Sequence, residues 1–350
     1  MGEKLCAVLI YISLVLAVSG ALPSNPNCPV YTCKSVNQTF TNITCVYYTK
    51  SATTSTYYVN PCTSLKAPYC TPSVMANSTC EPTPSTPPLN AWPGEKCTKN
   101  SDCNSLHARG GCVGGTCVGS ALNEICYTND DCNPGLRCFN EICQPQIPIG
   151  QSQCTSDYDC VNGAGCNVAN TPINSVCYPY FSIASHLPVG DCTSDNISYL
   201  CNSGYCMNNN GVYECMNTLS SKTFPNICQV DGDCYSTRDD FFPSGVLWGT
   251  CYCGYNPTAT SYCSLYFGDK PYVQAITYLK KWIQSTNINS CNTMRRFNTE
   301  CISDWWDAKD YSAYNYYTLN AYFWPLIEGS DNCTQQVYLP NWYAAKKNMS

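Results

Sequence analysis

The chain has 350 residues, of which 31 are Cys and only 12% are charged, and its net charge is -6. A cysteine content this high is typical of a disulfide scaffold. Lys and Arg form no cluster along the chain. A nucleic-acid-binding surface needs such a cluster to displace counterions from phosphates, so this class of function is excluded.

Residues 1–20 have the pattern of a secretory signal peptide. Lys4 precedes an apolar stretch from Leu5 to Val18, and the small residues Ser19, Gly20 and Ala21 follow it. The stretch is shorter than the ~20 residues of a membrane span. Cleavage would remove Cys6 and leave 31 - 1 = 30 cysteines, an even number that permits fifteen disulfides. We expect a secreted protein without a membrane span; a retained signal anchor is the alternative.

Glycosylation signals agree with this compartment. Asn-x-Ser/Thr sequons predict N-glycosylation at Asn37, Asn42, Asn77, Asn196, Asn332 and Asn348.

Residues 21–80 form a separate group of six cysteines. A segment from Thr39 to Thr49 is rich in Thr, Tyr, Val and Ile and predicts a strand, with residues 56–59 as its hairpin partner. The group is therefore predicted to be a small β-type cap. Residues 81–95 contain five prolines and predict a semi-rigid extended linker.

Residues 96–263 are predicted to be a tandem of small cysteine-rich modules. Modules this short bury too little apolar surface to fold unaided, so we expect disulfides to close each one. Four cysteines allow three pairings, and all three stay open. The structural cysteines of the first three modules are Cys97, Cys103, Cys112 and Cys117 (module 1), Cys126, Cys132, Cys138 and Cys143 (module 2), and Cys154, Cys160, Cys166 and Cys177 (module 3). Module 4 spans 192–215, and module 5 begins with Cys228 and Cys234 and closes through some of Cys251, Cys253 and Cys263.

An aspartate precedes the second cysteine of four modules, at Asp102, Asp131, Asp159 and Asp233. Such a carboxylate accepts backbone N–H groups and fixes a tight turn. Calcium is the alternative, above all at 231–233, but no module supplies the six or more oxygens that calcium needs. Module 4 has Leu200 at this position, which indicates a different local fold.

The segments 95–103, 126–138 and 154–160, with Asp102-Cys103, Asp131-Cys132 and Asp159-Cys160, resemble the Dickkopf N-terminal cysteine-rich pattern. They are also similar to repeated cysteine modules in secreted proteins of ciliates and other protists. The likeness covers residues 95–215. It implies an extracellular interaction module without catalysis. The Wnt co-receptor antagonism of animal Dickkopf proteins is not carried over, because this chain repeats one module type and has a different C-terminal region.

Other chemistries find little support. The whey-acidic-protein inhibitor module has a similar Asp-Cys step but needs an adjacent Cys-Cys pair, which this chain lacks. Zinc sites commonly use Cys-x2-Cys, and that spacing is missing too. The two histidines, His107 and His186, have no flanking motif of a catalytic triad. We therefore predict no catalytic residue, no metal and no cofactor.

Residues 264–350 are predicted to be an aromatic-rich helical region. Pro271 suits a first helical turn, and Val273, Ile276, Leu279, Trp282 and Ile283 follow at helical spacing. Further helices are predicted over 291–301 and over 304–323, ahead of Pro325. Two roles are open for the aromatic residues of the last predicted helix: packing in the core or an interface, and stacking against a carbohydrate. Their helical spacing favours packing. The residues are Tyr311, Tyr314, Tyr317, Tyr322, Phe323 and Trp324.

These observations predict a fold class of small disulfide-rich tandem modules with little regular secondary structure, a small β-type cap and a helical C-terminal region. The predicted function is a secreted, non-catalytic glycoprotein that acts as a binding or structural component of a cell coat, matrix or filament. Its expected partner is an extracellular protein or glycan, with head-to-tail self-assembly as the structural variant. A secreted protease inhibitor or enzyme accessory protein is the alternative. The array is interpreted as a spacer that holds the two ends apart.

Overall fold

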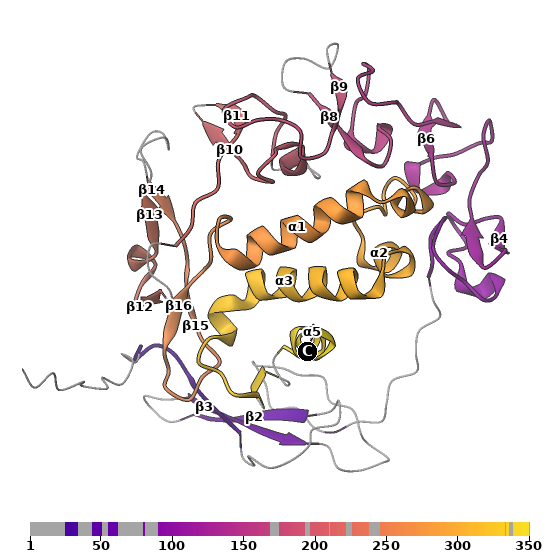
Figure 1. Ribbon diagram of the computed structural model, residues 1–350. Coiled ribbons are helices and arrows are strands. Elements are labelled where there is room, and N and C mark those ends of the chain that lie inside the picture. Colours follow the sequence, from indigo (N-terminus) through magenta and orange to yellow (C-terminus); the bar gives the residue numbers. More distant parts are fainter. Residues whose placement is uncertain are drawn as a thin grey trace, which may run out of the picture.

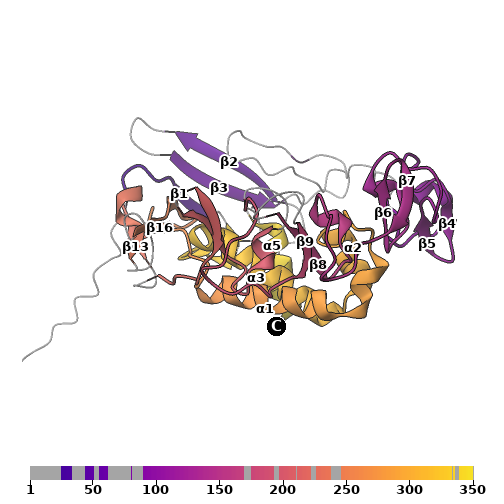
Figure 2. The same ribbon diagram turned by 90° about the horizontal axis from the view of Figure 1, so that it is seen from above.

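Cysteine-rich modules follow an arc around the two long helices α1 (Lys270–Gln284) and α3 (Ala308–Ile327), as Figure 1 shows. Modules 1 and 2 lie at one end of the arc and module 5 at the other (Figures 1 and 2). The computed structural model describes residues 25–33, 44–50, 55–61, 80, 90–168, 175–192, 197–209, 211–221, 226–237, 246–332, 334–335 and 339–349. The predicted signal peptide and most of the predicted linker lie outside these residues.

Modules 1 to 4 share one plan, a short antiparallel hairpin preceded by a 3-10 turn. The hairpins are β4 (Gly111–Val113) with β5 (Thr116–Val118), β6 (Leu136–Phe139) with β7 (Ile142–Pro145), β8 (Ala164–Asn167) with β9 (Val176–Pro179), and β10 (Cys206–Asn209) with β11 (Val212–Cys215). In each hairpin the third and fourth cysteines face each other across the two strands. The preceding turns are η1 (Asn100–Asp102), η2 (Asn129–Asp131), η3 (Asp157–Asp159) and η5 (Ile197–Leu200).

Module 5 is larger. Its sheet has the strand order β12 (Ile227–Cys228), β16 (Ser261–Cys263), β15 (Cys251–Cys253), and the turn η6 (Asp231–Asp233) follows β12. A second hairpin pairs β13 (Tyr235–Thr237) with β14 (Val246–Trp248).

In modules 1 to 4 the first cysteine bonds the third, and the second bonds the fourth. Module 5 follows the same order once its additional Cys253, which bonds Cys28, is set aside. The pairs are Cys97–Cys112, Cys103–Cys117, Cys126–Cys138, Cys132–Cys143, Cys154–Cys166, Cys160–Cys177, Cys192–Cys206, Cys201–Cys215, Cys228–Cys251 and Cys234–Cys263. The predicted disulfide-rich tandem is thereby confirmed. Module 4 keeps the same pairing although Leu200 replaces the aspartate, because Leu200 is fully buried and packs into the core instead.

The helical C-terminal region is confirmed, with corrections to its elements. Helix α1 has Pro271 in its first turn and buries Leu279, Trp282 and Ile283, as predicted. Val273 was wrongly assigned to the buried face. It is exposed, and Ala275, one helical turn before Leu279, is buried instead.

The predicted second helix over 291–301 is wrong. A 3-10 turn, η7 (Thr286–Ser290), follows α1, and α2 covers only Thr299–Trp305. Residues 291 and 301 would be ~15 Å apart along a continuous helix. The disulfide Cys291–Cys301 instead holds their Cα atoms 5.9 Å apart, so the chain between them must fold back.

The predicted third helix exists but is shifted. Helix α3 begins at Ala308, because the Asp307 carboxylate accepts the N–H groups of Lys309 and Asp310 and caps the first turn. It ends at Ile327, so Pro325 lies inside the last turn and does not terminate it. A shorter helix, α5 (Pro340–Met349), packs against α3.

The N-terminal region contains the predicted β structure. The sheet has the order β1 (Val30–Cys33), β3 (Ser55–Pro61), β2 (Thr44–Lys50), with β2 and β3 as the predicted antiparallel pair. Both views place α3 and α5 between α1 and this pair (Figures 1 and 2). The cysteine group is not separate, since Cys28 bonds Cys253 of module 5.

The array is not a spacer. The largest core cluster joins Leu200 and the Cys201–Cys215 disulfide of module 4 to Trp282, Ile302 and Trp306 of the helical region. At the other end of the chain, the Asn25 and Tyr31 N–H groups donate to the carbonyls of Ala259 and Asn256 in module 5. The modules therefore wrap around the helices, and disulfide and hydrogen bonds fasten residues 25–31 to module 5. Within the described ranges, no helix combines the length and hydropathy needed to cross a membrane.

Candidate interaction surface

The predicted turn-fixing role of the aspartates is confirmed in all four modules. Oδ2 of each carboxylate accepts the N–H groups of the residues three and four positions earlier. The donors are Thr98 and Lys99 for Asp102, Tyr127 and Thr128 for Asp131, Thr155 and Ser156 for Asp159, and Gln229 and Val230 for Asp233. Hydrogen bonds from the Thr98 hydroxyl and from backbone N–H groups lower the pKa of Asp102, and backbone N–H groups lower that of Asp233.

A second side chain in each of these turns escaped the sequence analysis. The residue two positions before the aspartate is Asn or Asp, and its Oδ1 accepts the N–H of the third cysteine at 2.7–2.9 Å. The acceptors are Asn100, Asn129, Asp157 and Asp231. The signal was readable as a repeated Asx-x-Asp-Cys motif. At 231–233 both carboxylates thus bind the backbone, which favours the turn role over calcium.

Two of the same aspartates also contact a basic side chain of the preceding module. The second oxygen of Asp131 lies 2.7 Å from His107 Nδ1 of module 1. The second oxygen of Asp159 lies 3.1 Å from Arg137 Nη1 of module 2. One carboxylate thus fixes the turn of its own module and also holds the preceding module.

The segment between α1 and α2 docks on modules 2 and 3 in an equivalent way. Asn292 Nδ2 donates to the carbonyls of Asn129 and Cys132, at the ends of the module 2 turn. Arg296 donates to the carbonyls of Asp157 and Cys160, the matching positions of module 3. Two side chains four residues apart therefore recognise two copies of the same turn.

Arg296 is fully buried and lies in a polar network. Its Nη2 lies 2.5 Å from the Tyr180 hydroxyl, which donates to Asp157 Oδ2 at 2.9 Å. Its Nε has no hydrogen-bond partner among the described residues. Burial, the largest effect, raises the pKa of the Tyr180 hydroxyl well above its ordinary value. This buried guanidinium, phenol and carboxylate join module 3 to the segment between α1 and α2.

Module 1 is held by a stack of flat side chains. The Trp92 ring lies between His107, with ring centroids 4.3 Å apart, and Arg295, whose Cζ is 3.6 Å from the ring centroid. His107 therefore contacts both Trp92 in this stack and the Asp131 carboxylate. The N–H of His186, the second histidine, donates to the Cys215 carbonyl in module 4. The structure does not bring the two histidines together.

Glu95 contacts the backbone of Trp92 in this stack, and the pKa of its carboxyl is raised. Oε2 accepts the Trp92 N–H at 2.8 Å, and Oε1 is buried without a hydrogen-bond donor among the described residues. Burial raises its pKa to about 7, against the opposing effect of Arg295. The carboxyl is thus protonated over a range in which an exposed Glu is charged.

Most of the C-terminal aromatic residues serve packing, as the sequence analysis favoured. Tyr311 and Tyr314 pack against the main core cluster, and Phe323 packs against a cluster formed with α5. Tyr317 stacks on Tyr278 of α1. Tyr322 differs, with 74% of its surface exposed.

Bulky apolar side chains are exposed where modules 1 and 2 meet. Leu106 is 69% exposed, Ile125 60% and Tyr127 71%. Arg109 links them, since its Nε donates to the Leu106 carbonyl and its guanidinium lies 5.4 Å from the Tyr127 ring centroid. We call Leu106, Arg109, Ile125 and Tyr127 the module 1–2 surface. Sequence reasoning missed it, because exposure depends on how the two modules pack.

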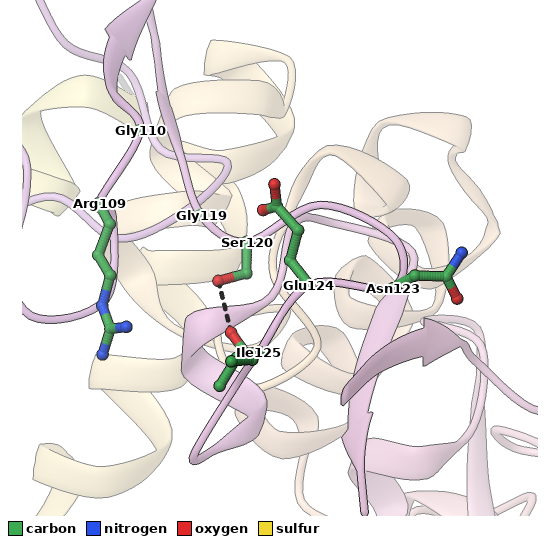
Figure 3. Close-up of a pocket in the computed structure, with 7 residues that line it drawn as sticks. All are labelled: Arg109, Gly110, Gly119, Ser120, Asn123, Glu124 and Ile125. Carbon is green, nitrogen blue, oxygen red and sulfur yellow. Dashed lines mark hydrogen bonds between the residues drawn. The ribbon is translucent and has the colours of Figure 1, made fainter. Parts of the chain in front are cut away.

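A groove of about 550 Å³ borders this surface at Arg109 and Ile125, which both line it. Figure 3 shows Arg109 at one side, Asn123 at the other, and Ser120 between them donating to the Ile125 carbonyl at 2.9 Å. Glu124 also lines the groove, so it carries one cationic and one anionic side chain. Such a mixed, mostly apolar depression suits a protein side chain better than a highly charged ligand.

The predicted site residues have mixed outcomes. The cysteines of modules 1 to 3 are all paired, so the sulfur atoms that cluster in each module belong to disulfides and supply no thiolate for zinc. Asn332 and Asn348 are exposed, and glycosylation there stays a prediction. Asn37, Asn42, Asn77 and Asn196 lie outside the described residues.

Comparison with known proteins returns no matching family model, curated protein or solved structure. The Dickkopf-type resemblance of the cysteine modules therefore stays an expectation based on their motifs.

Proposed function

We propose that this protein is a secreted, non-catalytic glycoprotein that binds an extracellular protein through the module 1–2 surface. Its many disulfides indicate an oxidising, extracellular compartment. The single observation that carries the proposal is the exposure of Leu106, Ile125 and Tyr127, of which Ile125 also lines a groove. Large apolar side chains grouped at a protein surface are a common mark of an interface.

The rigidity of the scaffold supports this function. Two disulfides close each of modules 1 and 2, and the His107–Asp131 pair fixes one module against the other. The exposed side chains therefore have little freedom to fold back and cover themselves. A preordered surface loses less conformational entropy when it binds. Tyr and Arg, both present here, are enriched among residues that dominate binding energy.

A binding experiment on intact cells tests the proposal. We expect labelled protein to bind the surface of cells from its own source saturably, and this binding to be lost after protease treatment of the cells. The triple variant Leu106→Ser, Ile125→Ser, Tyr127→Ser should bind at least about tenfold more weakly. A matched control replaces three other exposed residues by Ser and should bind like the wild type. They are Leu187, in the segment before module 4, Val212 of module 4 and Val230 of module 5.

Other outcomes separate the competing functions. Binding that survives protease treatment but disappears after glycan removal would replace the protein partner with a glycan. Oligomers that grow with protein concentration in sedimentation velocity, and that the triple variant abolishes, would favour the self-assembling structural variant. Hydrolysis or protease inhibition in an activity panel, unaffected by the triple variant, would contradict the non-catalytic proposal.

A further inference from the structure

A second cavity lies on the far side of the main core from modules 1 and 2, between module 4 and helices α1 and α3. Its volume is about 180 Å³. Residues from all three elements line it, among them Gly204, Tyr272, Ile276, Leu279, Tyr314 and Ala321. The space is a partly enclosed pocket between packed elements and is open to solvent on one side.

The walls of this cavity belong to elements that are held in place. Leu279 projects from α1 and Ala321 from α3, which pack against each other. The Cys201–Cys215 disulfide anchors module 4 on the same core. Gly204 has a φ of 71°, and a Cβ there would lie 3.0 Å from Ile276 Cδ1. Collapse of the cavity would require one of these elements to move.

The chemistry of the lining selects against charge. None of its lining residues, all of them within the described part of the chain, is ionic at neutral pH. The Tyr314 hydroxyl is already hydrogen-bonded to the Thr318 side chain, and burial raises its pKa. A charged ligand would lose its hydration here without gaining a partner of opposite sign. Aromatic side chains in the wall favour the edge or face of another ring.

One side of the cavity borders solvent. Phe267 lines the cavity and is 42% exposed, and its ring contacts Tyr205 and Tyr272 with centroids 4.6 Å and 5.0 Å apart. Phe267 therefore lies at the solvent side of the cavity. An apolar cavity of roughly 150 Å³ is large enough to hold benzene.

We propose that this cavity is a binding site for a small, neutral compound with a single aromatic ring. The proposal is independent of the module 1–2 surface, since no residue lines both sites. Toluene and p-cresol are suitable probes, and benzoate is the charged counterpart of similar size. We expect saturable binding of toluene or p-cresol to the intact secreted protein in ligand-observed NMR, together with a raised melting temperature, and no binding of benzoate.

Variants locate the site. Ala321→Leu extends a side chain from α3 into the cavity and should weaken binding of the neutral probes at least about tenfold while keeping or raising the melting temperature. If this variant does not fold, Ala275→Val narrows the same cavity from α1. Tyr322→Ala, the exposed neighbour on α3 that does not line the cavity, is the control and should bind like the wild type.

Two results would overturn the proposal. One is the absence of saturable binding of either neutral probe up to its solubility limit. The other is equal binding to the wild type and to a folded cavity-filling variant, which would place the probe elsewhere on the protein.

Discussion

The turn aspartates show how one residue type serves two levels of structure. Asp131 and Asp159 each use one oxygen for the turn of their own module and the other for a basic side chain of the preceding module. Because a carboxylate accepts several hydrogen bonds, it satisfies both contacts without a further residue. An asparagine in place of Asp159 would retain an acceptor for the turn but lose the ion pair with Arg137.

Glu95 gives a residue-level prediction about pH. Its pKa is about 7 in the folded chain, against an ordinary value of 4.5. Between these values the folded chain keeps a proton that the unfolded chain releases. The contribution of Glu95 to stability is therefore fully present below about pH 4.5 and is lost as the pH rises through about 7.

We expect Glu95→Gln to raise the free energy of unfolding at pH 8 by about 1–2 kcal/mol, because it removes a buried charge and retains an acceptor for the Trp92 N–H. At pH 4.5 the variant and the wild type should be nearly equal. Thermal unfolding at both pH values, with disulfides intact, measures the difference. Glu124→Gln is the control, since Glu124 makes the same contact to the Ala121 N–H but is exposed. A similar stabilisation by both variants would contradict this account.

At the scale of elements, the segment between α1 and α2 holds modules 2 and 3 against the helical region. Asn292 and Arg296 donate hydrogen bonds to the backbone carbonyls of two equivalent turns. In the opposite direction, Asn162 of module 3 donates to the carbonyls of Ile288 and Cys291. These polar contacts explain why the segment is not helical: its side chains and carbonyls are directed to the modules.

We expect Arg296→Met to destabilise the folded protein by about 3–5 kcal/mol, because it leaves the buried Asp157 carboxylate without its cation. Urea denaturation followed by tryptophan fluorescence measures this loss. Arg295→Met is the matched control: Arg295 is partly exposed and stacks on Trp92, so its replacement should cost only about 1 kcal/mol. Equal losses in the two variants would refute a special role for the buried network.

At the scale of the whole molecule, the Cys28–Cys253 disulfide ties the first described strand to module 5, across a sequence separation of 225 residues. Tyr31 packs on Tyr255 with ring centroids 4.8 Å apart, next to the Tyr31 N–H bond to Asn256. The N-terminal sheet is thereby joined covalently to the part of the array nearest the C-terminal helices.

The double variant Cys28→Ser, Cys253→Ser should release this connection without leaving a free thiol. We expect a loss of about 2–4 kcal/mol, since the bond restricts the unfolded chain. Hydrogen exchange of the Tyr31 amide should accelerate, whereas amides in the hairpins of modules 1 to 3 should keep their protection. Unchanged exchange at Tyr31 would show that the hydrogen bonds alone hold the strand.

The sequence by itself determined the local chemistry. Cysteine spacing predicted the modules, the Asp-Cys steps predicted the turns, and helical spacing around Leu279 and Trp282 predicted α1. These features depend on residues close together in the chain, no more than 29 positions apart even in the widest module disulfide, so the sequence pattern carries their physical cause. The same pattern left the disulfide pairing within each module open.

Only the tertiary structure decided how the modules are placed. Cys28 bonds a cysteine of module 5, Arg296 enters module 3, and Ile125 stays exposed beside module 1. The interpretation of the array as a spacer failed for this reason. Each contact joins residues far apart in the chain, and the carbonyls that Asn292 and Arg296 recognise are backbone groups that every residue carries. The residue types in the sequence do not indicate which carbonyl will accept such a hydrogen bond. Only the packing of the modules against the helices determines it.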